Sequence, residues 1–121
     1  MSETTQDQRK IGIVGPCACG KTTLIQGLAN HGYQARHIVQ EHSYVPGMWQ
    51  IVSNPDLLIF LDVTYAESLR RRAMDWTPHE YAEEQKRLRH ARENAHFYLH
   101  TDGLTPQQVL DRVLDFLIQA P

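Results

Sequence analysis

The segment GPCACGKT, residues 15–22, constrains the fold of this chain more than any other feature of its sequence. It directly follows the apolar run IGIV (11–14), which is typical of a strand buried on both faces of a parallel sheet. A helix is expected from about Gly20 to Asn30, with Gly32 as a stop signal beyond its end. The sequence therefore predicts a strand, a glycine-rich turn and a helix in immediate succession.

The turn matches the pattern G-x-x-x-x-G-K-[ST], which favours the binding of phosphate groups. Backbone N–H groups in such a loop point inward around an anion, and the helix N-terminus supplies further donors. Glycine is needed where the backbone approaches phosphate or takes a positive φ. We expect Lys21 to contact the terminal phosphates and the Thr22 hydroxyl to hold Mg²⁺.

Cys17 and Cys19 occupy free positions of this pattern. They are the only two cysteines, a structural zinc site needs four ligands, and the histidines show no zinc-like spacing with them. The plainest interpretation is that the loop tolerates small side chains at these positions. The alternative is redox sensitivity, because a helix N-terminus and a nearby lysine would lower the thiol pKa and oxidation would then block nucleotide binding.

The rest of the chain alternates between strand and helix patterns. Strands are expected over 33–40, 56–63 and 96–100, and helices over 65–74, 78–95 and 106–119. Each of these helices follows a capping box, a threonine with Glu or Gln three residues later: Thr64, Thr77 and Thr105. The helix from Pro78 has a thin apolar face and is expected at the surface. The order predicts an α/β fold in three layers, with a short parallel sheet of about four strands flanked by helices.

Length and charge restrict the function. The 121 residues fit one domain, over 10–121, after a polar lead-in at 1–9 that is expected to be disordered. A net charge of −2 gives no footprint for nucleic acid or an anionic membrane. No apolar segment approaches the roughly 20 residues that span a membrane, and the N-terminus lacks the apolar core of a secretory signal. We therefore expect a cytoplasmic protein without nucleic-acid or membrane partners.

Missing motifs narrow the class of phosphate-binding protein. The chain has no N/T-K-x-D guanine motif and no D-x-x-G switch, which argues against a GTPase switch. The strand LIFLD is followed by Val63 rather than by a catalytic acid, which argues against motor and transporter ATPases.

Three segments resemble the small P-loop kinases that phosphorylate nucleosides, nucleotides and other metabolites. GPCACGKTTL is similar to the phosphate loop of that family, and NPDLLIFLDVTYAESLRRR (54–72) is similar to its strand leading into the lid. AHFYLHTDGLTPQQVLDRVLDFL (95–117) is similar to its final strand, turn and last helix. The resemblance implies a P-loop fold that binds ATP and Mg²⁺ and transfers phosphate to a small-molecule acceptor, whose identity the sequence leaves open.

The resemblance also implies roles for individual residues. The loop, with Thr23 beside the α-phosphate, would hold the nucleotide: Gly15, Pro16, Cys17, Ala18, Cys19, Gly20, Lys21, Thr22 and Thr23. Asp102 and Gly103 would lie against the adenine. Arg70, Arg71 and Arg72 fall where the lid supplies arginines to the transferring phosphoryl group, or else form a solvated basic face at a helix end. Because successive helical residues point 100° apart, at most one or two of them face the site.

The chain also departs from this family. The family places a substrate-binding insert, and a strand with its own Mg²⁺-linked acid, where this chain has only the 14-residue bridge Glu41–Asn54. Glu41 lies at the carboxyl edge of the expected sheet and is a candidate general base or Mg²⁺ partner, or else a solvent-facing loop residue. Asp62 ends the strand 56–63 and either holds Mg²⁺ through water or caps the following turn. His42 either assists Glu41 or is structural.

Residues 42–52, HSYVPGMWQIV, bring aromatic side chains together around a Pro-Gly turn. They form either an aromatic pocket for a flat substrate or a hydrophobic plug over core left bare by the missing insert. The sequence thus favours an ATP- and Mg²⁺-dependent small-molecule kinase, with Lys21, Glu41, Arg71 and Arg72 as catalytic candidates. The alternative is a nucleotide-binding regulatory or interaction module that does not catalyse a reaction.

Overall fold

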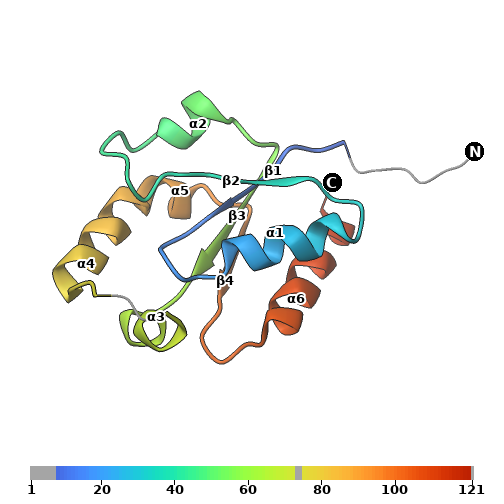
Figure 1. Cartoon of the computed structure of the whole chain (residues 1–121). Helices are drawn as coiled ribbons and strands as arrows, with labels where there is room; N and C mark the ends of the chain where they lie inside the picture. The colour runs from blue at the N-terminus through green and yellow to red at the C-terminus, as the bar shows by residue number, and fades with distance from the viewer. Residues whose placement is uncertain (1–7, 73–74, 121) are drawn as a thin grey trace, which may run out of the picture.

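Four parallel strands form one sheet in the order β2-β1-β3-β4 (Figure 1). They are β1 (Ile11–Val14), β2 (Ala35–His37), β3 (Leu57–Asp62) and β4 (Phe97–His100). β1 pairs with both β2 and β3, and β3 pairs with β4. The computed structural model describes residues 8–72 and 75–120. The predicted α/β class and the short parallel sheet are confirmed.

Helices cover both faces of this sheet (Figure 1). On one face, α1 (Lys21–Ala29) and α6 (Pro106–Gln119) bury Leu24, Leu28 and Val113 against the strands. On the other face, α2 (Met48–Val52) and α5 (Arg89–Glu93) bury Trp49 and Ala91. α3 (Tyr65–Arg71) and α4 (Pro78–Arg87) follow the carboxyl end of β3. The sheet therefore lies between two helical layers.

The alternation of side chains along β3 explains its continuous apolar sequence. Leu57, Ile59 and Leu61 belong to the cluster under α1 and α6. Leu58 and Phe60 belong to the cluster on the opposite face. A central strand of a parallel sheet has no solvent-facing side, so every position within it is apolar.

Two of the predicted capping boxes are complete. The side chains of Thr77 and Thr105 accept from the third helical N–H, and the side chain at that position returns to the cap N–H. The third prediction is only half right. The Thr64 side chain accepts from Glu67 N, but the Thr64 N–H donates to the Asp102 carboxylate instead. The Glu67 carboxylate is held by Arg70 and Arg71.

Several predicted boundaries differ from the structure. The helix expected over 78–95 is two helices, because the backbone of Leu88 leaves the helical path (ψ −4°) and its side chain is fully buried. The strand expected over 33–40 pairs with β1 only over 35–37. The bridge 41–54 contains the unpredicted helix α2.

Residues 1–7 of the expected lead-in, and residues 73 and 74 of the helix expected over 65–74, lie outside the described residues. Arg9, also in the lead-in, donates hydrogen bonds to the carbonyls of Leu117 and Ala120 at the end of α6. Within the described ranges, no helix is long and apolar enough to cross a bilayer.

Candidate functional site

The glycine-rich loop, residues 15–20, connects β1 to α1 and depends on two glycines for different reasons. A Cβ at Gly15 would lie 2.0 Å from the backbone oxygen of Leu61, so the loop passes too close to β3 for any side chain. Gly20 has φ 100° and ψ 21°, a left-handed conformation, and the space around it is open. Ala18 is also left-handed, with φ 69°. The loop is therefore fixed against β3 at its start and open at the N-terminus of α1.

A cavity of about 640 Å³ lies over this open end. The loop and the first turn of α1 form one wall, through residues 17–24. Side chains from four other segments complete it: His37, Glu41, Arg71, Arg72, Leu104, Pro106 and Val109. The Gly20 cap supplies no side-chain acceptor to the first turn of α1. Backbone donors of that turn thus remain for a ligand.

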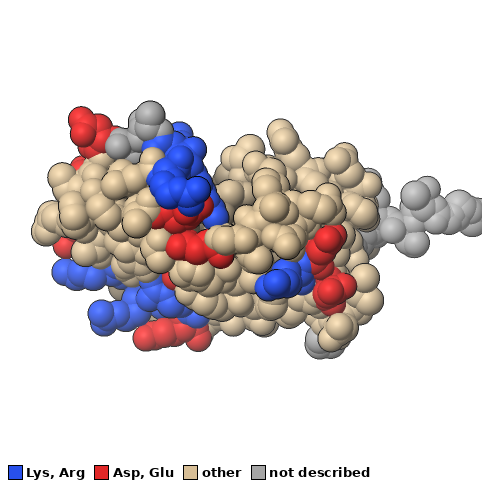
Figure 2. Space-filling model, turned by 90° about the horizontal axis from the view of Figure 1, so that it is seen from below, with Lys and Arg blue, Asp and Glu red and all other residues tan. Residues whose placement is uncertain are grey.

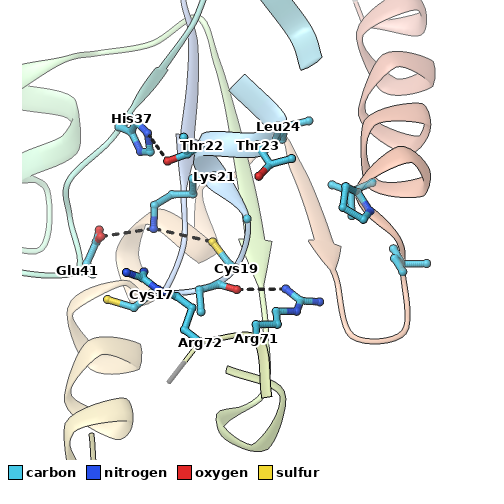
Figure 3. A pocket seen from close by; sticks show the side chains of 15 residues that line it. Cys17, Cys19, Lys21, Thr22, Thr23, Leu24, His37, Glu41, Arg71 and Arg72 are labelled. Carbon is cyan, nitrogen blue, oxygen red and sulfur yellow. Dashed lines mark hydrogen bonds and ion pairs between the residues drawn. The ribbon is translucent and has the colours of Figure 1, made fainter. Parts of the chain in front are cut away.

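Lys21 and Glu41 form an ion pair inside the cavity, with 3.4 Å between Nζ and Oε2 (Figure 3). Both side chains are largely buried, at 11% and 9% exposure. Lys21 Nζ also donates to the carbonyl of Gly15 at 2.6 Å and to that of Pro16 at 3.3 Å. Glu41 Oε1 is buried and has no hydrogen-bond partner within residues 8–72 and 75–120. One oxygen of this carboxylate is therefore available to a ligand.

Thr22 contacts a residue that sequence analysis did not single out. Its hydroxyl lies 3.3 Å from Nε2 of His37 (Figure 3). His37 is the last residue of β2, and β2 pairs with β1, so its side chain reaches the edge where the loop begins. His37 could have been predicted as a site residue from its position near the carboxyl end of a predicted strand. Thr23 also lines the cavity.

The three consecutive arginines have different surroundings. Arg71 donates to the carbonyl of Ala18 at 3.2 Å and to the carbonyl of Thr101 at 2.7 Å. Arg72 lines the cavity, and its guanidinium makes no hydrogen bond or ion pair with any other described residue. Arg70 is largely exposed and pairs with Glu67. Arg71 thus holds the loop, whereas Arg72 is free to meet a ligand.

Basic and acidic side chains are mixed over this side of the molecule. Figure 2 shows Lys and Arg side chains next to Asp and Glu side chains on the face seen from below. In the described part of the chain, Arg70 and Arg71 both pair with Glu67, and Lys86 pairs with Glu83. Arg72, by contrast, has no ion-pair partner among the described residues.

Cys17 is bound to α4 and is not a simple spacer. Its N–H and its thiol both donate to the carboxylate of Glu84, at 3.1 and 3.0 Å. Burial, followed by this hydrogen bond, raises the pKa of Cys17 to about 12. Burial also raises the pKa of Cys19 to about 11. The hypothesis of thiols activated by a lowered pKa is wrong, because desolvation outweighs the nearby lysine.

Asp62 does not line the cavity. Its carboxylate accepts from the Tyr98 hydroxyl at 2.6 Å, from Gln85 at 3.2 Å and from the N–H of Val63 at 2.9 Å. The alternation along β3 directs Asp62 to the side of Leu58 and Phe60, away from α1. The structure therefore separates this carboxylate from Lys21 and Thr22.

Asp102 and Gly103 are likewise outside the cavity. Both Asp102 oxygens bind Thr64, one accepting from its N–H at 3.1 Å and the other from its hydroxyl at 2.6 Å. Gly103 makes the following turn, with φ 78°. The same segment reaches the cavity one residue later, where Leu104 and Pro106 contribute an apolar wall.

The bridge 41–54 contributes core packing rather than an aromatic pocket. Trp49 is 5% exposed, and its Nε1 donates to Nδ1 of His90 at 3.0 Å. Tyr44 is 79% exposed and lies under the Arg87 guanidinium, 4.4 Å from the ring centroid. Glu41 is the one bridge residue among the cavity-lining residues that the structure describes. Trp49 is therefore buried in the core, as the hydrophobic-plug interpretation predicts.

The structure brings a further set of side chains together at the loop. Ligand-type atoms of Cys17, Glu41 and His42 all lie within 4.8 Å of one another. Cys17 is half-buried, Glu41 is buried and His42 is exposed. The sequence spacing of cysteines and histidines did not reveal this cluster, because Glu41 and His42 follow a different strand from Cys17.

The cavity as a whole combines backbone donors, three cationic side chains, a carboxylate and an apolar wall. Such a set suits a ligand that carries several negative charges and an apolar or flat part. A scan against protein-family models finds no match to this chain, and neither does a search of curated proteins.

Proposed function

We propose that this chain is a P-loop phosphotransferase that binds Mg²⁺ and a nucleoside triphosphate, ATP by preference, and phosphorylates a small molecule. One observation carries the proposal: a single cavity at the N-terminus of α1 is lined by Lys21, Glu41 and Arg72 together. The sequence pattern of residues 15–22 supports the same conclusion.

The cavity suits a triphosphate. Its open space at Gly20 adjoins uncapped N–H groups of α1, and this position favours negative charge. Lys21 Nζ now donates to two loop carbonyls, and it would exchange one of these for a phosphate oxygen. Leu104 and Pro106 would contact the apolar part of the nucleotide.

The available oxygens suit Mg²⁺, which prefers hard oxygen ligands. The Thr22 hydroxyl and Glu41 Oε1 are the candidates, and Oε1 is buried with no partner among the described residues. Bound Mg²⁺ would neutralise charge that develops on the phosphates. Glu41 therefore replaces Asp62 as the proposed metal-binding acid.

The two cavity arginines would have separate tasks. Phosphoryl transfer is catalysed mainly by positioning and by electrostatic stabilisation of the equatorial oxygens. The Arg72 guanidinium, which has no partner in the described part of the chain, would contact the transferring group, and this makes it the catalytic candidate. Arg71 is a positioning residue, because it is bound to the carbonyls of Ala18 and Thr101.

Titration calorimetry with Mg²⁺·ATP and Mg²⁺·GTP tests nucleotide binding. We expect wild type to bind and Lys21→Ala to lose at least about tenfold in affinity, since a charge-assisted contact to phosphate is removed. Lys86→Ala, which removes an exposed lysine of α4, is the matched control and should bind as wild type does. Absence of binding to both triphosphates would refute the proposal.

A phosphoryl-transfer screen over nucleosides, nucleotides and hydroxyl metabolites tests catalysis. Glu41→Gln should abolish transfer and keep triphosphate affinity. If Glu41 holds Mg²⁺, raising the Mg²⁺ concentration should restore part of the rate. If Glu41 is instead the general base for the acceptor hydroxyl, raising the Mg²⁺ concentration should leave the rate of Glu41→Gln unchanged.

A second candidate is a nucleotide-binding module without catalysis. The observation that favours it is the bridge 41–54, which offers only Glu41 to the cavity and buries Trp49 in the core. A phosphoryl acceptor would then find few side chains from this bridge to bind it. Triphosphate binding without transfer to any acceptor, and without hydrolysis, would support this candidate over the kinase.

A further inference from the structure

Three metal-ligating side chains meet beside the glycine-rich loop. Cys17 Sγ, a Glu41 carboxylate oxygen and a His42 ring nitrogen lie within 4.8 Å of one another. Cys17 follows β1, whereas Glu41 and His42 follow β2. Because β1 and β2 are parallel neighbours, the segments after them leave the sheet at the same edge. The fold thus unites residues that are far apart in sequence.

A second, independent observation points to a missing partner at this cluster. Glu41 is 7% exposed, and its Oε1 is buried without a hydrogen-bond partner within the described ranges. Its Oε2 is already paired with Lys21. An unpaired buried carboxylate oxygen is costly, so a cation at Oε1 would relieve the cost. This cation and the Mg²⁺ of the proposed kinase would compete for Oε1, so only one of them could occupy it at a time.

We propose that Cys17, Glu41 and His42 bind one borderline-soft divalent cation, for which Zn²⁺ is the best match. Thiolate and imidazole are ligands that Zn²⁺ prefers, whereas Mg²⁺ and Ca²⁺ select oxygen. A water molecule would complete a tetrahedral site. The cation displaces the thiol proton of Cys17, which passes to solvent.

The required rearrangement is small. Tetrahedral Zn²⁺ with bonds of about 2.0–2.3 Å holds its ligand atoms roughly 3.3–3.6 Å apart. Ligand atoms that now lie within 4.8 Å would therefore converge by little more than about 1 Å. His42 is exposed, so its ring is free to turn toward the other two side chains.

Neighbouring contacts hold both halves of the cluster in place. On one side, Glu84 accepts from the N–H of Cys17 and fixes the loop to α4, whereas its hydrogen bond from the thiol is given up when the cation displaces the thiol proton. On the other side, Arg87 donates to the carbonyl of Glu41 at 3.3 Å and to the Tyr44 hydroxyl at 2.7 Å. Such supporting contacts orient metal ligands before the ion arrives.

Cobalt binding tests this site directly and without nucleotide, so its outcome is separate from that of the proposed kinase activity. Co²⁺ replaces the spectroscopically silent Zn²⁺, and a Co²⁺–thiolate bond gives charge-transfer absorption in the near ultraviolet. We expect chelator-treated protein to develop this band, to saturate at one equivalent and to lose it on addition of Zn²⁺. A large excess of Mg²⁺ should leave the band unchanged.

Matched variants assign the ligands. Cys17→Ser should lose the band while its hydroxyl still reaches Glu84, and Cys19→Ser should keep it. His42→Ala should weaken Co²⁺ binding at least about tenfold, and His37→Ala should not. Since His42 is exposed, this comparison remains valid if Cys17→Ser fails to fold. Absence of the band in wild type, its persistence in Cys17→Ser, or its displacement by Mg²⁺ at equal concentration would overturn the proposal.

Discussion

The guanidinium of Arg71 donates a hydrogen bond to the backbone carbonyl of Ala18, 3.2 Å away, and so connects α3 to the glycine-rich loop. The same side chain donates to the carbonyl and the hydroxyl of Thr101, at 2.7 and 2.9 Å. Ala18 has a left-handed backbone, which a residue with a Cβ adopts only when its surroundings enforce it. Arg71 is one of the contacts that hold this conformation.

Arg71→Ala should therefore destabilise the fold, whereas Arg72→Ala should not. The first change removes several charge-assisted hydrogen bonds to partly buried acceptors, and we expect a loss of about 1.5–3 kcal/mol in the free energy of unfolding. The second removes an exposed side chain that has no partner among the described residues, and it should stay within about 0.5 kcal/mol of wild type. Urea denaturation measures both. Equal stabilities of the two variants would contradict the assignment.

Kinetic measurements should also distinguish Arg71 from Arg72, and here the larger effect on turnover is expected at Arg72. Arg72→Ala should lower the turnover number with little change in triphosphate affinity, because its charge would act mainly on the transferring group. Arg71→Lys is the conservative test of positioning, since lysine keeps the charge and loses the planar donor set. It should weaken triphosphate affinity by loosening the loop. Single-turnover kinetics together with calorimetry distinguish these effects.

The two loop glycines should also respond differently to alanine. At Gly15 a Cβ would lie 2.0 Å from the Leu61 oxygen, so Gly15→Ala should cost about 3 kcal/mol or more in stability. At Gly20 the space is open, and only the left-handed backbone opposes a side chain, at about 1–2 kcal/mol. Gly20→Ala should fold and lose triphosphate binding, because its methyl group enters the space over α1. Thermal unfolding and calorimetry provide the two measurements.

The sequence predicted the sheet and the loop because their signals are local. The apolar run of β3 indicates burial on both faces of the sheet. Thr77 and Thr105 each form a capping box with a residue three positions later, so the sequence predicts where their helices begin. The break at Leu88 and the helix α2 depend on tertiary packing, since the side chains of Leu88 and Trp49 both enter the core opposite α1. No periodicity within the sequence carries that information.

The site residues also divide into those that local sequence signals predict and those that depend on tertiary contacts. Glu41 was predicted because it follows a strand at the ligand-binding edge of the sheet, and His37 lies at that same edge. The position of Asp62 at a strand end predicted either a Mg²⁺ ligand or a cap on the following turn; its carboxylate accepts from the Val63 N–H and from the Tyr98 hydroxyl and does not line the cavity. The contact between Cys17 and Glu84 joins segments 67 residues apart, which no spacing rule connects.

Trp49 provides a test of the core opposite α1. Trp49→Ala should cost about 3–5 kcal/mol in stability, as expected for a large buried aromatic residue. Trp49→Phe should cost less, because it keeps most of the packing and loses the hydrogen bond to His90. Denaturation curves compare the two variants. Near-wild-type stability of Trp49→Ala would show that the bridge 41–54 is not part of the core.

Burial of the Cys17 thiol should make the free energy of unfolding fall as the pH rises. The pKa of Cys17 is raised to about 12 in the folded protein, whereas an unfolded cysteine loses its proton at about 8.5. Between these values the unfolded state binds fewer protons than the folded state, so stability falls as pH rises. Metal-free Cys17→Ser lacks this titration and should show a shallower fall between about pH 9 and pH 10.5.

The comparison isolates Cys17, because Cys19 and Tyr98, whose pKa values are also raised, remain in both proteins. The same protonated thiol should react slowly with iodoacetamide near neutral pH, since the thiolate is the nucleophile. The rate in denaturant supplies the reference. A folded protein that alkylates as fast as the unfolded chain, or equal pH slopes for wild type and Cys17→Ser, would mean that Glu84 does not hold the thiol in its protonated form.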